Sequence, residues 1–182
     1  MNYLIIGGAK SGKSNFGEGI ALRLNKDKVI YIATMKPYDK EDEKRIEIHI
    51  KNREGLNFIT IEKQRDIQDL LDKINNEDTV LLDSITSLLT NEMFLNNEII
   101  NKPSVKILNG INEILKKAKN TILISDYIFS DSMEYDKITE NFRRELGIIN
   151  RSLAKECDDV FECKFGIIKR HKFRGEEYEK TL

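Results

Sequence analysis

An apolar segment near the N-terminus runs directly into a complete phosphate-binding loop. Residues 3–6 read Tyr-Leu-Ile-Ile, and residues 7–14 follow with the pattern G-x-x-x-x-G-K-S. The two glycines of the pattern allow backbone conformations that a Cβ disfavours, so successive N–H groups can turn toward a phosphate. A helical pattern over residues 13–24 then places the N-terminus of a helix at the same anion. Strand, loop and helix in this order predict an α/β fold that binds a nucleoside triphosphate.

Two side chains of the loop and one acid elsewhere have expected roles in this binding. Lys13 supplies a positive charge for the β- and γ-phosphate oxygens, and the Ser14 hydroxyl is placed to ligate Mg²⁺. The apolar run at residues 80–82 ends in Asp83, where P-loop enzymes place a carboxylate for the same metal. Alternatively, Asp83 and Ser84 only cap the next helix. The phosphate loop upstream favours the metal role.

Short β-branched runs alternate with helical patterns along the rest of the chain. The runs at 79–83 and 121–126 are apolar with little alternation, as in parallel strands covered on both faces. The pattern predicts a three-layer fold with a mostly parallel central sheet, a possible hairpin at one edge, and the ligand at the carboxyl ends of the strands. Strands are expected at 3–6, 29–33, 58–62, 79–83, 121–126, 159–165 and 167–171, and helices at 13–24, 39–53, 66–75, 85–94, 104–118 and 135–157. The polar segment 96–102 fits either a loop over the site or a contact between subunits.

Length, charge and cysteine content restrict the class of protein. The 182 residues are 40% hydrophobic and 34% charged, which is typical of one folded domain over 1–182. The formal net charge of −1 gives no basic surplus for nucleic acid, and no apolar stretch is long enough to span a membrane. Cys157 and Cys163 match no zinc or redox spacing and are expected to be buried, reduced thiols. With no export signal, this indicates a cytoplasmic protein.

One of the two histidines lies in a highly charged helical pattern. Arg45, His49 and Arg53 are four residues apart and therefore share a helix face, with Ile46 and Ile50 expected to line the adjacent strip toward the core. Two flanking cations disfavour the imidazolium form, and a neutral imidazole beside bound phosphates can attack phosphorus. The alternative is a solvated helix face, which the residues alone favour.

The other histidine and the guanidinium groups have simpler expectations. His171 lies among Lys and Arg residues and is expected to be an exposed member of a basic strand end. Arg45 and Arg53 are our candidates for holding the transferred phosphoryl group by bidentate hydrogen bonds.

Several motifs occur in a distinctive order along the chain. They are GGAKSGKS at 7–14, YIAT at 31–34, R-I-x-x-H-x-x-x-R at 45–53, Glu62 after a short strand, LLDSIT at 81–86, Thr90-Asn91, and FRRELGIINRSLA at 142–154. In this order and spacing the chain resembles the bifunctional adenosylcobinamide kinase / adenosylcobinamide-phosphate guanylyltransferase family of cobalamin biosynthesis. It departs from the family's usual pattern at residues 125–131, where Asn-Glu and a glycine-containing turn are usual, and at Asp83, where Glu is usual.

The resemblance implies two reactions on one RecA-like P-loop domain. The first phosphorylates the aminopropanol hydroxyl of adenosylcobinamide with ATP or GTP. The second transfers GMP from GTP to that phosphate through a guanylyl-histidine at His49, releasing pyrophosphate and adenosyl-GDP-cobinamide. The resemblance also implies a homotrimer, with Lys13 and His49 as catalytic residues and Mg²⁺ on Ser14 and Asp83. The implied nucleotide-binding positions are Gly7, Gly8, Ala9, Lys10, Ser11, Gly12, Lys13, Ser14, Ala33, Thr34, Met35, Lys51, Asn52, Arg53, Glu62 and Asp83.

Two other functions fit parts of the sequence. A simple P-loop kinase for another small alcohol would share the loop, Asp83 and the fold, and would leave His49 an ordinary helix residue. A RecA-type nucleotide switch that binds nucleic acid or a protein partner would need a basic stripe, which the balanced composition does not indicate.

Overall fold

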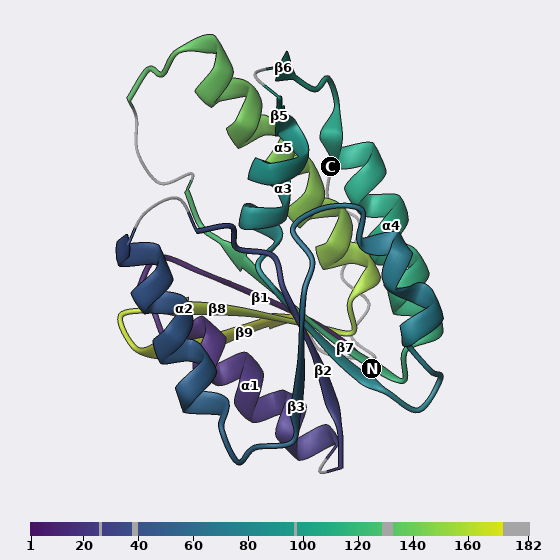
Figure 1. Ribbon diagram of the computed structural model, residues 1–182. Helices are drawn as coiled ribbons and strands as arrows, with labels where there is room; N and C mark the ends of the chain where they lie inside the picture. The colour runs from purple at the N-terminus through teal and green to yellow at the C-terminus, as the bar shows by residue number, and fades with distance from the viewer. Residues whose placement is uncertain (26, 38–39, 97, 129–132, 173–182) are drawn as a thin grey trace.

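The computed structural model describes residues 1–25, 27–37, 40–96, 98–128 and 133–172, with the side chains at 42, 43, 45, 49 and 52 outside that description. Figure 1 shows a central twisted sheet with helices on both faces. The elements are β1 (Asn2–Gly7), α1 (Lys13–Leu24), β2 (Val29–Ala33), α2 (Lys40–Arg53), β3 (Phe58–Glu62), the 3₁₀ helix η1 (Ile67–Lys73), β4 (Thr79–Asp83), α3 (Ile85–Met93), β5 (Phe94–Leu95), β6 (Glu98–Ile99), α4 (Pro103–Lys117), β7 (Asn120–Asp126), α5 (Lys137–Glu156), β8 (Asp159–Lys164) and β9 (Ile167–Lys172).

Strand order places the phosphate loop in the middle of the sheet. The order is β3-β2-β4-β7-β1-β8-β9, and every neighbouring pair is parallel except β8 with β9. The parallel three-layer fold and the edge hairpin are therefore confirmed. Because β7 lies between β1 and β4, the ends of these three strands meet at one edge of the sheet.

Each face of the sheet is covered by its own apolar core. Helix α1 packs on one face against β1, β4 and β7, and α2 lies beside α1 (Figure 1). Gly17 of α1 allows this close approach, because a Cβ there would lie 2.6 Å from Ile124 Cδ1. Helices α3, α4 and α5 and the η1 segment cover the other face, and α5 inserts Leu146, Ile149 and Leu153, all fully buried.

Local details correct the expected elements in three places. Within the expected helix 66–75, Ile67–Lys73 forms a 3₁₀ helix, and burial of Ile67 and Leu70 at three-residue spacing matches that tighter helix. Within the undecided segment 96–102, Glu98–Ile99 forms β6, which pairs antiparallel with β5 just before the segment. The expectation for Ile50 is wrong: 42% of this residue is exposed, so the strip beside the histidine face does not reach the core there.

Both cysteines are buried and free, as expected. Burial raises the pKa of the Cys157 thiol to about 12 and also raises that of Cys163, which keeps both thiols protonated at neutral pH. His171 is exposed on β9, and its Nε2 lies 2.8 Å from Glu162 Oε2. Residues 129–132 of the divergent loop and the charged tail from 173 lie outside the described residues.

Candidate nucleotide-binding and catalytic site

The glycine-rich loop joins β1 to α1 in a compact turn. Gly12 precedes the helix with φ of +88°, a left-handed conformation that favours glycine, and Lys10 also has a positive φ. The Ser11 N–H donates to the Gly8 carbonyl oxygen at 3.3 Å, and the Phe16 N–H donates to the Gly12 carbonyl oxygen at 3.0 Å. Helix α1 begins at Lys13 with no side-chain cap, so its N-terminal N–H groups remain available to an anion.

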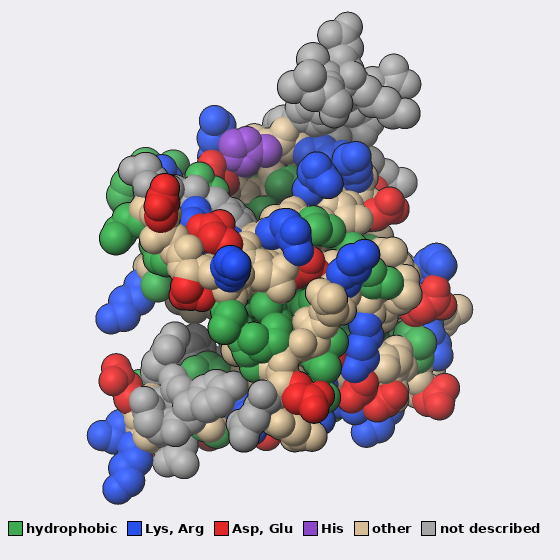
Figure 2. All heavy atoms as spheres, turned by 90° about the horizontal axis from the view of Figure 1, so that it is seen from above, with side chains coloured by type: hydrophobic (Ala, Val, Ile, Leu, Met, Phe, Trp, Pro, Cys, Tyr) green, Lys and Arg blue, Asp and Glu red, His purple; other side chains and the backbone are tan. Residues whose placement is uncertain are grey.

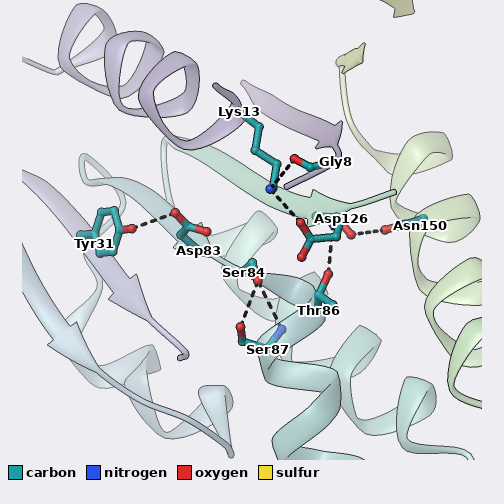
Figure 3. Close-up of polar contacts among 10 residues, drawn as sticks. Gly8, Lys13, Tyr31, Asp83, Ser84, Thr86, Ser87, Asp126 and Asn150 are labelled. Carbon is teal, nitrogen blue, oxygen red and sulfur yellow. Dashed lines mark hydrogen bonds and ion pairs between the residues drawn. The ribbon is translucent and has the colours of Figure 1, made fainter. Parts of the chain in front are cut away.

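Lys13 lies between its own loop and the end of β7. Its Nζ is 2.7 Å from Asp126 Oδ1 and donates to the Gly8 carbonyl oxygen at 3.2 Å, as Figure 3 shows. Only 12% of the Lys13 side chain is exposed, against 27% for Asp126. The cation expected to bind the β- and γ-phosphates is therefore already paired with a carboxylate.

Asp83 ends β4 with one carboxylate oxygen engaged. Tyr31 Oη donates to Asp83 Oδ2 at 2.9 Å, and the rest of the carboxylate points away from Tyr31, toward Lys13 and Asp126 (Figure 3). Burial, and then the negative charge of Asp83, raise the pKa of Tyr31, so its hydroxyl keeps its proton. The cap of α3 comes from Ser84, whose Oγ accepts from the Ser87 N–H at 3.2 Å. Asp83 is thus free of the capping role that we considered as an alternative.

Thr34 joins the ends of β2 and β4. Its Oγ1 donates to the Ser84 carbonyl oxygen at 2.7 Å and accepts from the Ser84 N–H at 2.8 Å. The Asn91 amide donates to the Thr34 carbonyl oxygen at 2.8 Å, and Thr34 is fully buried. The Thr34 side chain therefore contacts protein backbone here and supports the position of Asp83.

Outside the phosphate loop, the predicted nucleotide-binding residues lie in two places. Glu62, Ala33 and Asp83 are adjacent in register at the ends of β3, β2 and β4, at the same sheet edge as the phosphate loop. Met35 is two residues beyond the end of β2. The second group, residues 51–53, forms the last turn of α2, which runs back from that edge because it connects two parallel strands (Figure 1).

Arg53 makes contacts that differ from those expected. Its guanidinium carbon lies 3.7 Å from the centroid of the Tyr31 ring, and its Nη1 is 3.3 Å from Glu18 Oε1 of α1. Arg53 is 6% exposed, and its Nε has no hydrogen-bond partner in the described part of the chain. Arg53 is therefore linked to the site indirectly, because its guanidinium lies over the Tyr31 ring and the Tyr31 hydroxyl donates to Asp83. The helix that carries His49 is confirmed over 40–53, whereas the side chains of Arg45, His49 and Asn52 lie outside the description.

A cavity of about 510 Å³ opens beside the phosphate loop. Residues 7–11, Tyr127 and residues 162–166 of the β8–β9 turn line it. Another cavity, of about 450 Å³, lies near the start of α4 and contains none of the predicted site residues.

Ser14 and Asp83 are the residues that could hold Mg²⁺. Ser14 is in the first turn of α1, and Asp83 presents a carboxylate oxygen that does not bond to Tyr31. P-loop enzymes usually hold Mg²⁺ with one or two protein oxygens plus phosphate oxygens and water, so this pair fits the ion. Within the described residues, no group of three or more His, Cys, Asp or Glu side chains forms a metal site.

Comparison with known families decides the broad assignment. The profile of the family "Cobinamide kinase / cobinamide phosphate guanyltransferase" matches residues 3–170. The chain belongs to this family. It is accordingly an enzyme, a kinase and nucleotidyltransferase of cobalamin biosynthesis, as its motifs predicted.

Two relatives carry the name "Bifunctional adenosylcobalamin biosynthesis protein CobU". The protein of Escherichia coli (strain K12) is 27% identical over 182 residues, and that of Salmonella typhimurium (strain LT2) is 29% identical over 181 residues. Each alignment covers 92% of this chain and 97% of the relative. The family assignment therefore extends over nearly the whole chain.

Solved structures support the fold. One solved ATPase domain matches with a TM-score of 0.57 at 13% identity, covering 97% of this chain and 78% of that domain. The RadB recombinase matches with a TM-score of 0.54 at 20% identity, covering 96% and 83%. Both confirm the predicted RecA-like P-loop fold. Among the described residues, no helix has the length and apolar character needed to cross a membrane.

Three contributors to the site were not predicted from the sequence. Asp126 ends the apolar run 121–125 just as Asp83 ends its own strand, and this shared pattern was the available signal. Tyr31 and Glu18 gave no such signal, because their partners are 52 and 35 residues away along the chain.

Proposed function

We propose that this member of the family phosphorylates adenosylcobinamide and then transfers GMP from GTP to the adenosylcobinamide phosphate. The observation that carries the proposal is the meeting of Lys13, Asp126 and Asp83 at one sheet edge, beside a loop with free N–H groups. The family profile and the names of the two relatives supply the substrate class.

In the kinase step the acceptor hydroxyl oxygen attacks the γ-phosphorus of ATP or GTP. A P–O bond to the acceptor forms, the bond to the β-phosphate bridging oxygen breaks, and the nucleoside diphosphate leaves. Lys13 and the loop N–H groups stabilise the charge on the phosphates. Mg²⁺, which Ser14 and Asp83 would hold, supplies further neutralisation of the leaving group when bound.

In the transferase step we propose that a ring nitrogen of neutral His49 attacks the α-phosphorus of GTP. The N–P bond forms, the bond between the α-phosphorus and the bridging oxygen breaks, and pyrophosphate leaves from the phosphate loop. An oxygen of the acceptor phosphate then attacks the same phosphorus and releases His49. The loop thus serves two cleavages, at the γ- and the α-phosphorus.

Labelled GTP distinguishes this proposal from a simple kinase. We expect α-labelled GTP to leave an acid-labile, base-stable label on the chain, and His49→Ala to remove it while nucleotide binding continues. The matched control is His171→Ala, which removes the exposed histidine paired with Glu162 and should leave the label intact. No label on the unaltered chain, together with active γ-phosphate transfer, would instead establish the simple kinase.

We further propose that the protein acts in the cytoplasm as a homotrimer of single-domain chains. The family resemblance and the two free thiols support this. On the face seen in Figure 2, acidic and basic side chains are interspersed, which does not favour a nucleic-acid partner. Sedimentation equilibrium measures the oligomeric state directly, and a monomer at micromolar concentration would contradict the trimer.

A further inference from the structure

Asp126 is placed at the phosphate loop by strand pairing. It ends β7 directly opposite Gly7 in the β1–β7 register, and the Tyr127 N–H donates to the Gly7 carbonyl oxygen at 3.1 Å. The Asp126 N–H donates to Thr86 Oγ1 of α3 at 3.0 Å. The preceding residue is also fixed, because Ser125 Oγ donates to Asn150 Oδ1 of α5 at 2.7 Å. The carboxylate therefore projects from a rigid strand end.

Its two oxygens have different environments. Oδ1 is the partner of Lys13 at 2.7 Å, whereas Oδ2 has no hydrogen bond to any described residue. The Asp126 side chain is 27% exposed, so a bound substrate can reach the carboxylate.

The position of Lys13 indicates which part of a bound substrate lies near Asp126 Oδ2. The lysine of this motif binds β- and γ-phosphate oxygens, so a carboxylate bonded to the same ammonium lies next to the γ-phosphate. A carboxylate there repels the triphosphate and weakens its binding. Its position is therefore better explained by a use in the reaction. The kinase step supplies a use, since the acceptor hydroxyl must lose its proton as it attacks the γ-phosphorus.

We infer that Asp126 is the general base of the kinase step, an inference that rests on the proposed function. As the acceptor oxygen bonds to the γ-phosphorus, its proton passes to the free carboxylate oxygen, and the electron pair of the breaking P–O bond leaves with the nucleoside diphosphate. The proton then passes to solvent before the next turnover. The Lys13 ammonium, 2.7 Å from Oδ1, keeps the carboxylate oriented between turnovers.

The transferase step does not need this base. Its nucleophiles are a neutral imidazole nitrogen and an acceptor phosphate oxygen, and an ionised phosphate oxygen has no proton to give up. The inference therefore predicts that loss of the Asp126 carboxylate separates the two half-reactions of one enzyme. A purely structural role for Asp126 predicts that both fall together, because both use the same loop.

The experiment compares the unaltered chain with Asp126→Asn and Asp126→Ala. Phosphorylation of cobinamide is followed with γ-labelled triphosphate, and GMP transfer with α-labelled GTP and an acceptor that is already phosphorylated. The matched control is Glu77→Gln. It removes the acid of an exposed ion pair in which Lys119 Nζ lies 2.5 Å from Glu77 Oε2. A rise in unfolding temperature with added triphosphate shows that each variant is folded and binds.

For both Asp126 variants we expect the kinase kcat to fall about 10²-fold or more. The KM for the triphosphate should be unchanged or lower, because a negative charge beside the γ-phosphate is gone. GMP transfer should stay within about threefold, and Glu77→Gln should change neither activity.

Three results would overturn the inference. A kinase kcat within about threefold of the unaltered chain in Asp126→Asn removes the base role and leaves a carboxylate that only pairs with Lys13. A parallel loss of both activities assigns Asp126 a structural role. Absence of γ-phosphate transfer by the unaltered chain contradicts the kinase function itself, and is thereby distinguishable from a failure of Asp126 alone.

Discussion

Two lysine–carboxylate clusters, one at the carboxyl ends of the strands and one among the helices on one face of the sheet, differ in how many of their carboxylate oxygens are bonded. In the first, Lys13 pairs with Asp126 at the glycine loop, and one carboxylate oxygen has no partner among the described residues. In the second, Lys106 of α4 pairs with Asp66 Oδ1 at 2.5 Å and with Glu92 Oε2 at 2.7 Å. The other oxygen of Glu92 accepts from the Asp66 N–H at 2.8 Å.

This difference indicates that the Lys13 cluster serves substrate binding and that the Lys106 cluster serves the stability of the fold. Glu92 is 6% exposed and both of its oxygens accept hydrogen bonds, so its cluster holds Asp66, α3 and α4 together, while Glu92 and Lys106 also line the cavity near the start of α4. Lys13 and Asp126 lie beside loop N–H groups that are available to an anion, and their neighbours Gly8 and Tyr127 line the cavity there. We therefore expect changes in the first cluster to alter activity and changes in the second to alter folding.

The largest effect is expected from Lys13→Ala. Loss of the cation removes the main charge for the β- and γ-phosphates, and both half-reactions should fall about 10³-fold. Stability should change by less than about 1 kcal/mol, because 27% of the Asp126 side chain is exposed and water can solvate its carboxylate once the ammonium is gone. Steady-state rates and denaturant unfolding at neutral pH measure the two quantities. A large loss of stability with modest loss of rate would remove the contrast between the clusters.

The opposite outcome is expected from Lys106→Met. The substitution leaves the buried Glu92 carboxylate without its cation, which should lower the free energy of unfolding by about 1–2 kcal/mol. The effect stays below that of a fully buried pair because 47% of the Lys106 side chain is exposed. Both activities should remain within about twofold of the unaltered chain. Denaturant unfolding is the measurement, and a loss of activity without a loss of stability would contradict the structural role.

The pH dependence of stability sharpens the same comparison. The hydrogen bond from Lys106 lowers the pKa of Asp66, so this stabilisation is present above the unfolded value of about 3.9 and is lost as the pH falls through the folded value. Burial tends to lower the pKa of Lys106, but hydrogen bonds to Asp66 and Glu92 outweigh it and raise that pKa. The lysine contribution is present below about 10.4 and is lost as the pH rises through the raised value.

The cluster therefore stabilises the fold most between about pH 4 and pH 10. In Lys106→Met the decline of stability at either end of this range should be shallower than in the unaltered chain. Unfolding free energies across the pH range test this, and parallel curves for the two proteins would show that the cluster adds nothing.

The sequence predicted the fold well because the signals for it are local. Apolar runs at 79–83 and 121–126 and the stripe along α5 report burial directly, and alternation of strands with helices permits few topologies. The exception is Ile50, which follows a helical period although 42% of the residue is exposed. Helical spacing shows which residues share a face and does not show how the helix is seated.

The site was predicted only in part because its pairings are long-range. The phosphate loop is one continuous segment, so its motif describes it fully. Asp126 reaches Lys13 because β7 is inserted between β1 and β4, an order that the sequence of elements does not reveal. Arg53, which we predict to hold the phosphoryl group, also contacts Glu18 and Tyr31, and the sequence did not predict these contacts because both partners come from other elements.

The smallest of the expected effects, in Tyr31→Phe, tests the support of Asp83. The substitution removes the hydroxyl that donates to Asp83 Oδ2 but keeps the ring beneath Arg53. Because partners of metal-binding carboxylates fix their orientation, we expect the Mg²⁺ concentration for half-maximal rate to rise about tenfold in both half-reactions. The maximal rate at saturating Mg²⁺ should change by no more than about threefold. Titration of each activity with Mg²⁺ measures this shift.

Asp83→Asn provides the comparison for Tyr31→Phe. It alters the carboxylate itself, so it should raise the Mg²⁺ requirement further than Tyr31→Phe does. If Tyr31→Phe leaves the requirement unchanged while Asp83→Asn raises it, the tyrosine only fills the core and the Arg53–Tyr31–Asp83 contacts do not serve the metal. If neither variant alters it, Asp83 is not a magnesium ligand, and the first cluster alone accounts for the charge at the phosphate loop.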